Sequence, residues 1–474
     1  MQRLFFIAVF LLFVLFSVCV YAGEPETIYT DIAVGNFTDA KKRINQLLTG
    51  GSVPPLERWN WNFQKERMNR IEIDFSADKD KVLEHIRRYF PDISPEQLAK
   101  WKAEKSLEVM QINGEERYFH AAAANLFRIS KEAKAKKQKI DGTGKDKFHE
   151  FLEHNTAAIR SKAKESNSPV GIEPRTFKIT YTVTVPADTV PAGEVIRCWL
   201  PFPHNSRRLT DVKLLESNLT NAVIAPPEYE HATLYGEKVA VKGKDTLFQE
   251  TVQFKATAES FDLDTVLVKP YNQDSELYKK YTAERETHII FTPEIKALSK
   301  TIVGNETEPV KVAQKIFDWI TSTIPWASSR EYSTMENIPS YILENGHGDC
   351  GMVTLLMLTL CRHNGIPAKW QSGFMLHPGS VNLHDWGEIY FEGTGWIPVD
   401  TSFGLRKIGG VQPFFLGGID SYRWIVNEDY SGNLYPSKIY PRSETVDLQR
   451  GEVEWRGGNL YFNQWKWNID CEEQ

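Results

Sequence analysis

A run of apolar residues from Met352 to His363 constrains this chain more than any other segment, because it is apolar on nearly every side of a helix. Such a helix has no face for water and must lie inside a core. Asp349 precedes the run as a natural N-cap, and Gly365 with Pro367 gives the usual stop signal after it. The sequence therefore predicts a buried helix that begins at Cys350.

The position of Cys350 at that helix start favours a chemical role. A neutral thiol attacks carbonyl groups poorly, so a nucleophilic cysteine needs a nearby base or cation. The amide groups of the first turn, including that of Gly351, are expected to point at the sulfur, to lower its pKa and to offer donors to an oxyanion. Considered alone, a cysteine at a helix start is more often a packing residue.

A predicted hairpin supplies two further groups. Its strands are Leu383–Tyr390 and Thr394–Asp400, joined by the three-residue loop Phe391–Gly393. That register places His384 directly opposite Asp400, and the Cβ atoms of such cross-strand neighbours lie roughly 5 Å apart. A carboxylate there fixes the imidazole tautomer and stabilises the imidazolium, as in serine and cysteine triads.

The stretch from about Glu284 to Phe403 resembles the transglutaminase-like superfamily, a branch of the papain-like thiol enzymes. The resemblance rests on Gly348-Asp349-Cys350 before an apolar helix, on Arg362 to Ala368 after it, on His384-x-Trp386, and on Gly395-Trp396-x-Pro398-Val399-Asp400. It covers about a quarter of the chain and implies a papain-like core, in which a helix bearing the cysteine packs on an antiparallel sheet.

By this resemblance Cys350 is the nucleophile, His384 the general base and acid, and Asp400 the orienting carboxylate. Two residues depart from the family pattern. Lys369 stands where the family usually has arginine, and Asp385 follows the histidine where a small residue is common. Neither departure removes a member of the triad.

The resemblance implies an acyl-enzyme, which either water or an amine can resolve. Bacterial members of this kind resemble hydrolases, so we expect hydrolysis of peptide or isopeptide bonds in a peptide or protein substrate, with cell-wall peptide among the candidates. One alternative is a protein-glutamine transamidase that forms crosslinks. The other is a non-catalytic scaffold that retains the core and binds glycans or envelope partners.

The first residues predict a place outside the cytoplasm. Arg3 precedes a mostly apolar run from Leu4 to Val20, and Val20-Tyr21-Ala22 is a small-residue cleavage pattern. Residues 1–22 are therefore interpreted as a secretory signal, which makes the protein secreted, periplasmic or part of the cell envelope. A signal anchor is the alternative, and no later segment is apolar enough to span a bilayer.

Composition excludes several classes of protein. The formal charge of −6 and the isoelectric point near 6.1 argue against a nucleic-acid binder, which normally has a basic surplus. None of the 11 histidines forms an H-x-x-x-H or H-E-x-x-H pair with a plausible third ligand, so we expect no metal and no cofactor.

The cysteines are too few for a disulfide-stapled scaffold. Cys361 follows Cys350 on the same helix at a distance of roughly 16 Å along the axis, so these two thiols cannot bond. A disulfide between Cys198 and Cys471 stays permitted. Stability must therefore come from ordinary hydrophobic cores.

The fold class expected is α+β, in four regions after the signal. Residues 23–170 are predicted to be helical, 171–283 an antiparallel β-sandwich, 284–404 the transglutaminase-like core, and 405–474 an aromatic-rich extension that packs on the core. The expected helices begin at Ser94-Pro95 and span Tyr118–Ala133 and Phe148–Lys164. The expected strands are Phe177–Val185, Val195–Leu200, Val212–Leu215, Lys238–Val241, Thr246–Ala256, and a pair at Arg450–Trp455 and Asn459–Phe462.

Three further residues are candidates for the surroundings of the thiol. Trp326 and Trp386 are candidates for a groove wall or, in the case of Trp326, an oxyanion donor. His347 is interpreted as a loop histidine at the rim of the site rather than as a participant in the reaction.

Overall fold

The computed structural model describes residues 24–50, 53–142, 144, 146–409 and 413–474. The chain divides into two compact units, Met1–Asp141 and Gly142–Gln474. The secretory signal predicted at residues 1–22 lies outside the described residues. In the described part, no helix combines the length and the apolar character needed to cross a membrane.

The first unit is mainly helical around its own apolar core, which includes Trp61, Phe75, Trp101 and Phe119. A short antiparallel hairpin, β1 (Val109–Ile112) and β2 (Glu115–Tyr118), accompanies the helices. The helices are α2 (Glu24–Ala33), α3 (Phe37–Thr49), α4 (Pro55–Asp74), α5 (Lys79–Arg87), α6 (Pro95–Ala103), α7 (Ala122–Ile129) and α8 (Lys131–Asp141).

Helix starts were predicted better than helix lengths in this unit. Ser94 caps α6, because its hydroxyl accepts a hydrogen bond from the amide of Gln97 at 3.2 Å. The single helix expected over Tyr118–Ala133 was wrong: Tyr118 ends β2, and Ser130 adopts extended backbone between α7 and α8. The Ser130 hydroxyl then accepts from the amide of Ala133, so this residue starts a new helix instead of continuing the old one.

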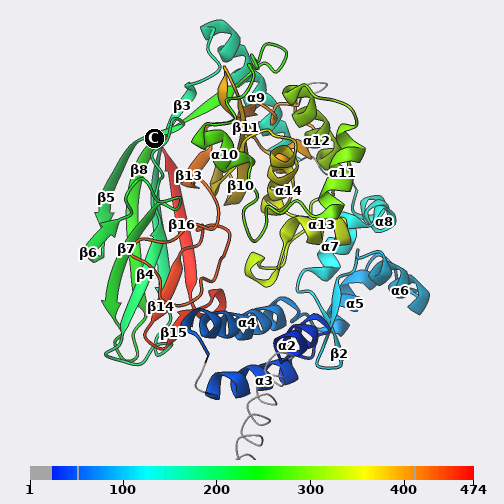
Figure 1. Cartoon of the computed structure of the whole chain (residues 1–474), viewed down its shortest axis with the longest axis vertical. Coiled ribbons are helices and arrows are strands. Elements are labelled where there is room, and N and C mark those ends of the chain that lie inside the picture. Colours follow the sequence, from blue (N-terminus) through cyan, green and yellow to red (C-terminus); the bar gives the residue numbers. More distant parts are fainter. Residues whose placement is uncertain (1–23, 51–52, 143, 145, 410–412) are drawn as a thin grey trace, which may run out of the picture. The chain divides into compact units, whose positions relative to one another are not determined.

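The second unit begins with α9 (Lys147–Ser166), close to the predicted helix, and continues into two five-stranded sheets. The first has the order β12-β8-β3-β16, with β5 also paired to β8, and the second the order β15-β14-β4-β7-β6. Their strands are β3 (Ile172–Val185), β4 (Val195–Pro201), β5 (Leu209–Ser217), β6 (Thr220–Ile224), β7 (Thr233–Val239), β8 (Thr246–Ser260), β12 (Gly418–Ile419), β14 (Glu452–Trp455), β15 (Gly458–Leu460) and β16 (Lys466–Glu473). Figure 1 shows these long strands beside the helices of the core.

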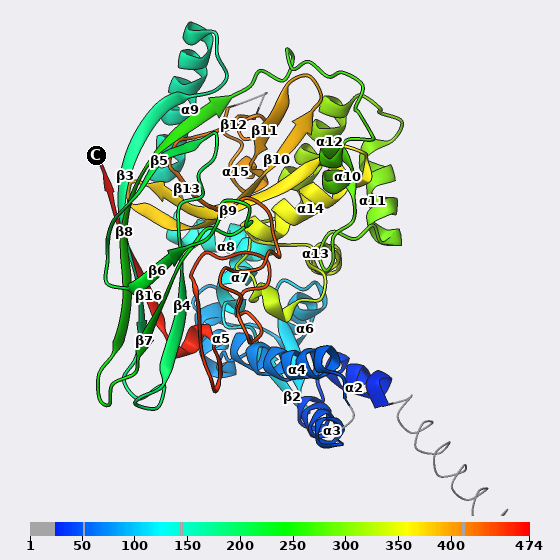
Figure 2. The ribbon, with the colours of Figure 1, turned by 60° about the vertical axis from the view of Figure 1, so that its left-hand side comes forward.

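A third, four-stranded antiparallel sheet carries the candidate site, in the order β11-β10-β9-β13. Its strands are β9 (Ala368–His377), β10 (Ser380–Phe391), β11 (Gly395–Val399) and β13 (Arg423–Asn427). The helices of this region are α10 (Glu276–Thr282), α11 (Pro293–Val303), α12 (Pro309–Thr323), α13 (Ile338–Asn345), α14 (Cys350–His363) and α15 (Thr401–Gly404), with short 3-10 turns at Tyr332–Thr334 and Phe462–Gln464. Figure 2 shows α14 lying against β9 and β10.

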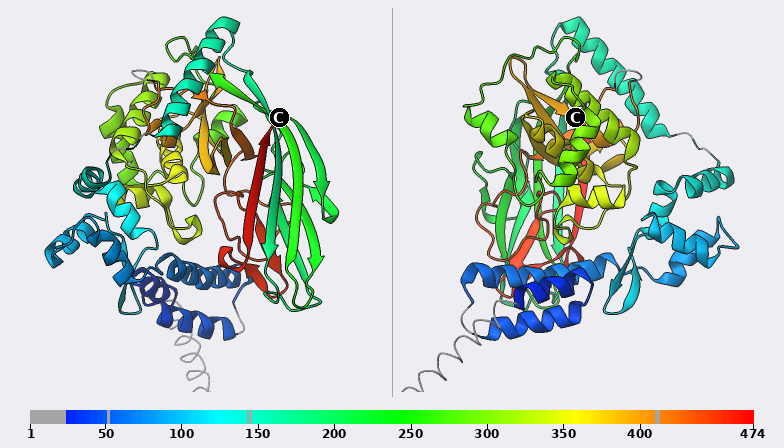
Figure 3. Two further views of the ribbon diagram at one scale, coloured as in Figure 1. Left: turned by 180° about the vertical axis from the view of Figure 1, so that it is seen from behind. Right: turned by 45° about the vertical axis from the view of Figure 1, so that its right-hand side comes forward.

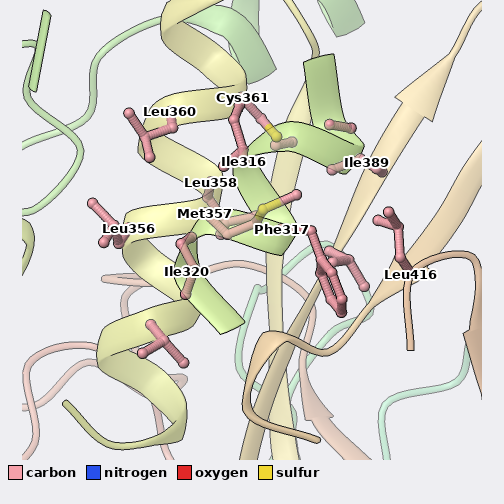
Figure 4. Close-up of a cluster of buried hydrophobic side chains, with 14 of the residues drawn as sticks. Ile316, Phe317, Ile320, Leu356, Met357, Leu358, Leu360, Cys361, Ile389 and Leu416 are labelled. Atoms are coloured by element: carbon pink, nitrogen blue, oxygen red, sulfur yellow. The ribbon is translucent and has the colours of Figure 1, made fainter. Parts of the chain in front are cut away.

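Helix α14 is the central buried helix that the sequence predicts. Every residue from Gly351 to Arg362 is buried. Figure 4 shows its apolar side chains, such as Leu358 and Cys361, meeting Phe317 of α12 and Ile389 of β10. An α-helix with an apolar surface on all sides is stable only in such surroundings. The predicted α+β fold class is thus confirmed.

Strands from the last part of the chain enter all three sheets. β13 pairs with β9 in the sheet of the candidate site, β16 pairs with β3, and β14 pairs with β4. Figure 3 shows the red β16 lying along the green strands of the sandwich. Cys198 on β4 and Cys471 on β16 belong to different sheets, and both thiols are free.

Candidate active site

The candidate nucleophile Cys350 is the first residue of α14, and its exposure is intermediate. Asp349 caps this helix: its carboxylate accepts from the amide of Met352 at 3.1 Å and from the hydroxyl of Tyr332 at 2.7 Å. Burial raises the pKa of Asp349 to about 6. The cap and the buried helix together fix the position of the sulfur at the start of α14.

The candidate base His384 lies on β10, opposite Gly373 of β9, and is buried. Its Nε2 donates to Oδ2 of Asp400 at 2.7 Å. The imidazole packs against Phe403 with the ring centroids 4.4 Å apart, and it stacks on Trp386 at 5.9 Å. Burial lowers the pKa of His384 although Asp400 favours its charged form, so the imidazole rests neutral at pH 7.

The candidate orienting residue Asp400 follows β11 and caps α15. One carboxylate oxygen accepts from the amide of Phe403 at 2.9 Å, and the other accepts from both His384 and Arg423, the latter at 2.9 Å. Burial alone would raise the pKa of Asp400, but His384 and Arg423 outweigh it and hold this pKa below its usual range. Asp400 is therefore ionised beside the imidazole.

The hairpin register predicted from the sequence was wrong by one loop position. Phe391 pairs with Gly395, so the loop is Glu392–Thr394, and Thr394 is held there by the hydrogen bond from its hydroxyl to the carbonyl of Leu267. Asp400 consequently does not lie directly opposite His384. Moving a three-residue loop by one position shifts the pairing by two residues, and the side-chain period of a strand is also two. The two side chains therefore stay on one face and still meet.

The thiol itself binds a residue that the sequence showed only as a departure from the family pattern. Sγ of Cys350 donates to Oδ2 of Asp385 at 3.1 Å, and among the described residues no hydrogen bond joins Cys350 to His384. Successive side chains of a strand point to opposite faces, so Asp385 reaches α14 while His384 faces Asp400. Burial raises the pKa of the Cys350 thiol well above its ordinary value, and Asp385 and Asp349 add to the increase. This is the reverse of the lowering expected from the helix start alone.

Residues distant in the sequence complete the site. The side-chain amide of Gln449 donates to the backbone carbonyl of His384 at 3.0 Å and to Oδ1 of Asp385 at 2.7 Å. The hydroxyl of Tyr332 also contacts Oδ2 of Asp385, at 3.4 Å. No local pattern marks Arg423, Gln449 or Tyr332, since each acts through a contact that only the folded chain creates.

The other candidates have separate positions. Trp326 pairs as an isolated bridge with Gly348, two residues before the sulfur, and is 38% exposed, as a groove wall would be. Trp386 is fully buried, and its indole N–H donates to the side chain of Gln371 at 2.9 Å, so it backs the imidazole of His384. His347 is 2% exposed and is not the rim residue expected from the sequence.

A cavity of about 410 Å³ opens on the side of β10 that carries Glu388, away from the thiol. Its wall holds an ion cluster in which Glu388 binds Lys369 at 2.9 Å and Arg207 at 2.6 Å, and Lys369 also binds Glu428. No residue of the proposed triad lines this cavity. Lys369, the other departure from the family pattern, thus belongs to a charge network and not to the thiol site.

No arrangement in the described part of the chain brings three or more histidine, cysteine, aspartate or glutamate side chains together as metal ligands. The chemistry that this geometry offers is that of a thiol, an imidazole and a carboxylate.

Comparison with protein families places the same residues in a recognised core. Residues 296–401 match the transglutaminase-like superfamily core, and this range contains Cys350, His384 and Asp400. The match covers the helices α11–α14 and the sheet from β9 to β11. The part of the chain that bears the candidate site is therefore a transglutaminase-like core.

Individual relatives are distant. An uncharacterised protein from Haemophilus influenzae is 25% identical over 265 residues, which cover 48% of this chain and 68% of that protein. A provisionally assigned cysteine protease from Cytophaga hutchinsonii has 14% identity and a TM-score of 0.44, over 64% of this chain and 91% of its own. The periplasmic domain of TgpA from Pseudomonas aeruginosa has 12% identity and a TM-score of 0.26, over 48% and 88%.

Proposed function

We propose that this chain, whose residues 296–401 form a transglutaminase-like core, is a cysteine-nucleophile enzyme that hydrolyses peptide or isopeptide bonds outside the cytoplasm. The observation that carries the proposal is the pair of His384 and Asp400. Nε2 of His384 is committed to Asp400, and Nδ1 has no hydrogen-bond partner among the described residues. That nitrogen is the one available to accept the proton of Cys350.

The first step is proton transfer and attack. Sγ of Cys350 must first leave Asp385 and come within hydrogen-bond reach of Nδ1 of His384. The thiol proton then moves to Nδ1, and the electron pair left on sulfur attacks the substrate carbonyl carbon. Asp400, kept ionised by Arg423, stabilises the imidazolium that results. Amide groups at the start of α14 are donors for the oxyanion.

The second step is release. His384 returns its proton to the leaving amine as the tetrahedral intermediate collapses, which leaves an acyl thioester on Cys350. Water then gives a proton to His384 and attacks the thioester, and the acid product departs with the thiol restored. An amine in place of water would give transamidation instead.

Removal of either reacting group tests the proposal. We expect Cys350→Ala and His384→Ala to lower turnover by roughly 10³-fold or more, measured with a diverse peptide library that includes cell-wall stem peptides. Cys471→Ser is the matched control, because this thiol lies on β16 and contacts no member of the triad. Unchanged turnover in either of the first two variants contradicts the assignment.

Two measurements separate the proposal from its alternatives. A transamidase would incorporate a labelled primary amine into glutamine-bearing protein, whereas a hydrolase would release acid product with or without the amine. A scaffold would turn over no peptide, and its Cys350 would be alkylated as slowly as Cys198 and Cys361, which are both buried.

A further inference from the structure

The carboxyl group of Asp385 is hydrogen-bonded to the sulfur of Cys350. The side chain of Asp385 accepts from three uncharged donors, Sγ of Cys350 at 3.1 Å, the amide of Gln449 at 2.7 Å and the hydroxyl of Tyr332 at 3.4 Å, and it also shares a hydrogen bond with the buried carboxyl of Asp447. The contact is tight on the side of Gly351, because a Cβ added there would lie 2.2 Å from the Tyr332 hydroxyl and 2.8 Å from Oδ2 of Asp385. The carboxyl group of Asp385 is therefore closely packed against the sulfur of Cys350.

The charges around this contact are mostly negative. Asp385 is 3% exposed, and in the described part of the chain no lysine, arginine or histidine forms an ion pair with it. Arg450, the cation of the same segment as Gln449, is bound to Glu331 by two hydrogen bonds. The titratable groups that act on this contact are Tyr332, Asp349, Asp400, Glu444 and Asp447, while Arg442 and Arg450 act on Asp447.

We propose that Asp385 keeps Cys350 as a neutral, unreactive thiol in the resting site, and so sets the pH at which the nucleophile becomes reactive. The inference rests on the proposed function in taking Cys350 as the nucleophile. A thiol can donate to the carboxylate only while it holds its proton, and a thiolate in the same position would face a like charge without a compensating cation. The proton leaves only when Sγ turns to His384: the S–H bond breaks, an N–H bond forms at Nδ1, and the electron pair stays on sulfur.

The protonation of the pair agrees with this assignment. The pKa of Cys350 is raised by burial and by Asp385, and the pKa of Asp385 is raised by burial and by Asp447. The thiol of Cys350 and the carboxyl of Asp385 therefore both resist deprotonation. Because the two groups are in contact, they titrate together. A small uncharged residue at position 385 would remove the barrier to the thiolate.

The test is the rate of alkylation of Cys350 by iodoacetamide as a function of pH, without substrate. Asp385→Asn is nearly isosteric. We expect it to lower the midpoint of the alkylation rate against pH by at least about one pH unit and to raise the alkylation rate at pH 7 about tenfold. Asp385→Ala should do the same and guards against a new hydrogen bond from the asparagine amide. Glu444→Gln is the matched control, since it changes another buried carboxyl of the same cluster that does not touch the sulfur.

The outcomes are distinct. An unchanged midpoint in both Asp385 variants, with thermal unfolding showing them folded, overturns the proposal. Slower alkylation at pH 7 overturns it too, since Asp385 would then be the acceptor of the thiol proton. The measurement needs no turnover, so the midpoint can shift even if no peptide is hydrolysed. Hydrolysis without a shift would leave the proposed function intact and remove this inference alone.

Discussion

Buried charged groups hold the side chains of this site in place. Asp400 and Asp420 both bind Arg423, and all three side chains are buried. Loss of one partner from such a group leaves an uncompensated charge and is strongly destabilising, by about 3 to 5 kcal/mol. The imidazole of His384 is thus oriented by a rigid framework and not by Asp400 alone.

His347 provides a prediction about pH and stability. Burial lowers its pKa to about 4, whereas an unfolded chain protonates histidine near 6.5. The unfolded state therefore binds more protons at this residue between these values, so the contribution of His347 to the free energy of unfolding is constant above pH 6.5 and falls as the pH drops from 6.5 to 4. The loss amounts to roughly 3 kcal/mol.

Urea unfolding of the wild type and of His347→Gln at pH 7 and pH 4.5 checks this expectation. The variant should lose less stability between the two pH values than the wild type does. His154→Gln is the control variant, because this histidine is exposed on α9. Equal pH dependence in wild type and His347→Gln would contradict the prediction.

Local sequence signals predicted several residues of the site and missed the others for a physical reason. Asp349 as a helix cap and the contact of His384 with Asp400 depend on neighbours within a few residues or across one hairpin. Asp385 was visible only as an unusual residue, because its partner Cys350 lies across the space between a strand and a helix. Arg423 and Gln449 come from strands and loops whose place only the folded chain defines.

At the scale of elements, the start of α14 is where helix, strand and turn converge. Alanine normally stabilises a helix relative to glycine by roughly 0.5 to 1 kcal/mol. Gly351 is an exception, because the space of a Cβ atom is already taken by Tyr332 and Asp385. The first turn of α14 therefore depends on a residue without a side chain.

We expect Gly351→Ala to displace Tyr332 and Asp385 and to lower kcat/KM by at least about tenfold, while the helix itself still forms. Turnover and the near-ultraviolet signal of the tyrosines would report the displacement. Gly144→Ala is the control, since a Cβ there meets nothing within 4 Å. Full activity of Gly351→Ala would contradict the prediction, because Tyr332 and Asp385 would then move aside without any loss of turnover.

The periodicity of the sequence predicted most helices and strands. Where these elements begin and end depends on contacts with distant residues, which periodicity does not show. The strand expected at Phe177–Val185 extends back to Ile172, because β8 offers backbone partners as far as Ala258. β6 was missed, since its residues are mostly exposed and lack the alternation of a half-buried strand. The loop after β10 moved by one residue for the same reason, a contact of Thr394 outside the hairpin.

For the whole second unit, the last strands are structural partners of the first ones. β16 pairs with β3 along its full length, from Lys466 opposite Thr184 to Glu473 opposite Phe177. Composition suggested an aromatic extension packed on the core, and no sequence signal shows which strand a distant segment will pair with. The pairing of strands that lie far apart in the sequence, such as β16 and β3, is therefore hard to predict from one sequence.

Deletion of residues 465–474 is expected to expose the edge of β3 and the core beside it. The unfolding temperature should fall by roughly 5 °C or more and the soluble yield should drop, because an unpaired edge strand promotes aggregation. The double variant Asn468→Ser and Asp470→Ser is the control: both residues are exposed, and the backbone pairing stays intact. An unfolding temperature equal to that of the full chain would refute the structural role of β16.

The amide of Gln449 that bridges His384 and Asp385 has a consequence during synthesis. A ribosome that has translated only as far as Asp400 has already made the sulfur, the imidazole and the carboxylate. It has not yet made Arg423 or Gln449, so the nascent polypeptide has no finished catalytic centre. The contacts around the candidate site are therefore complete only after the late residues have folded back onto the earlier ones.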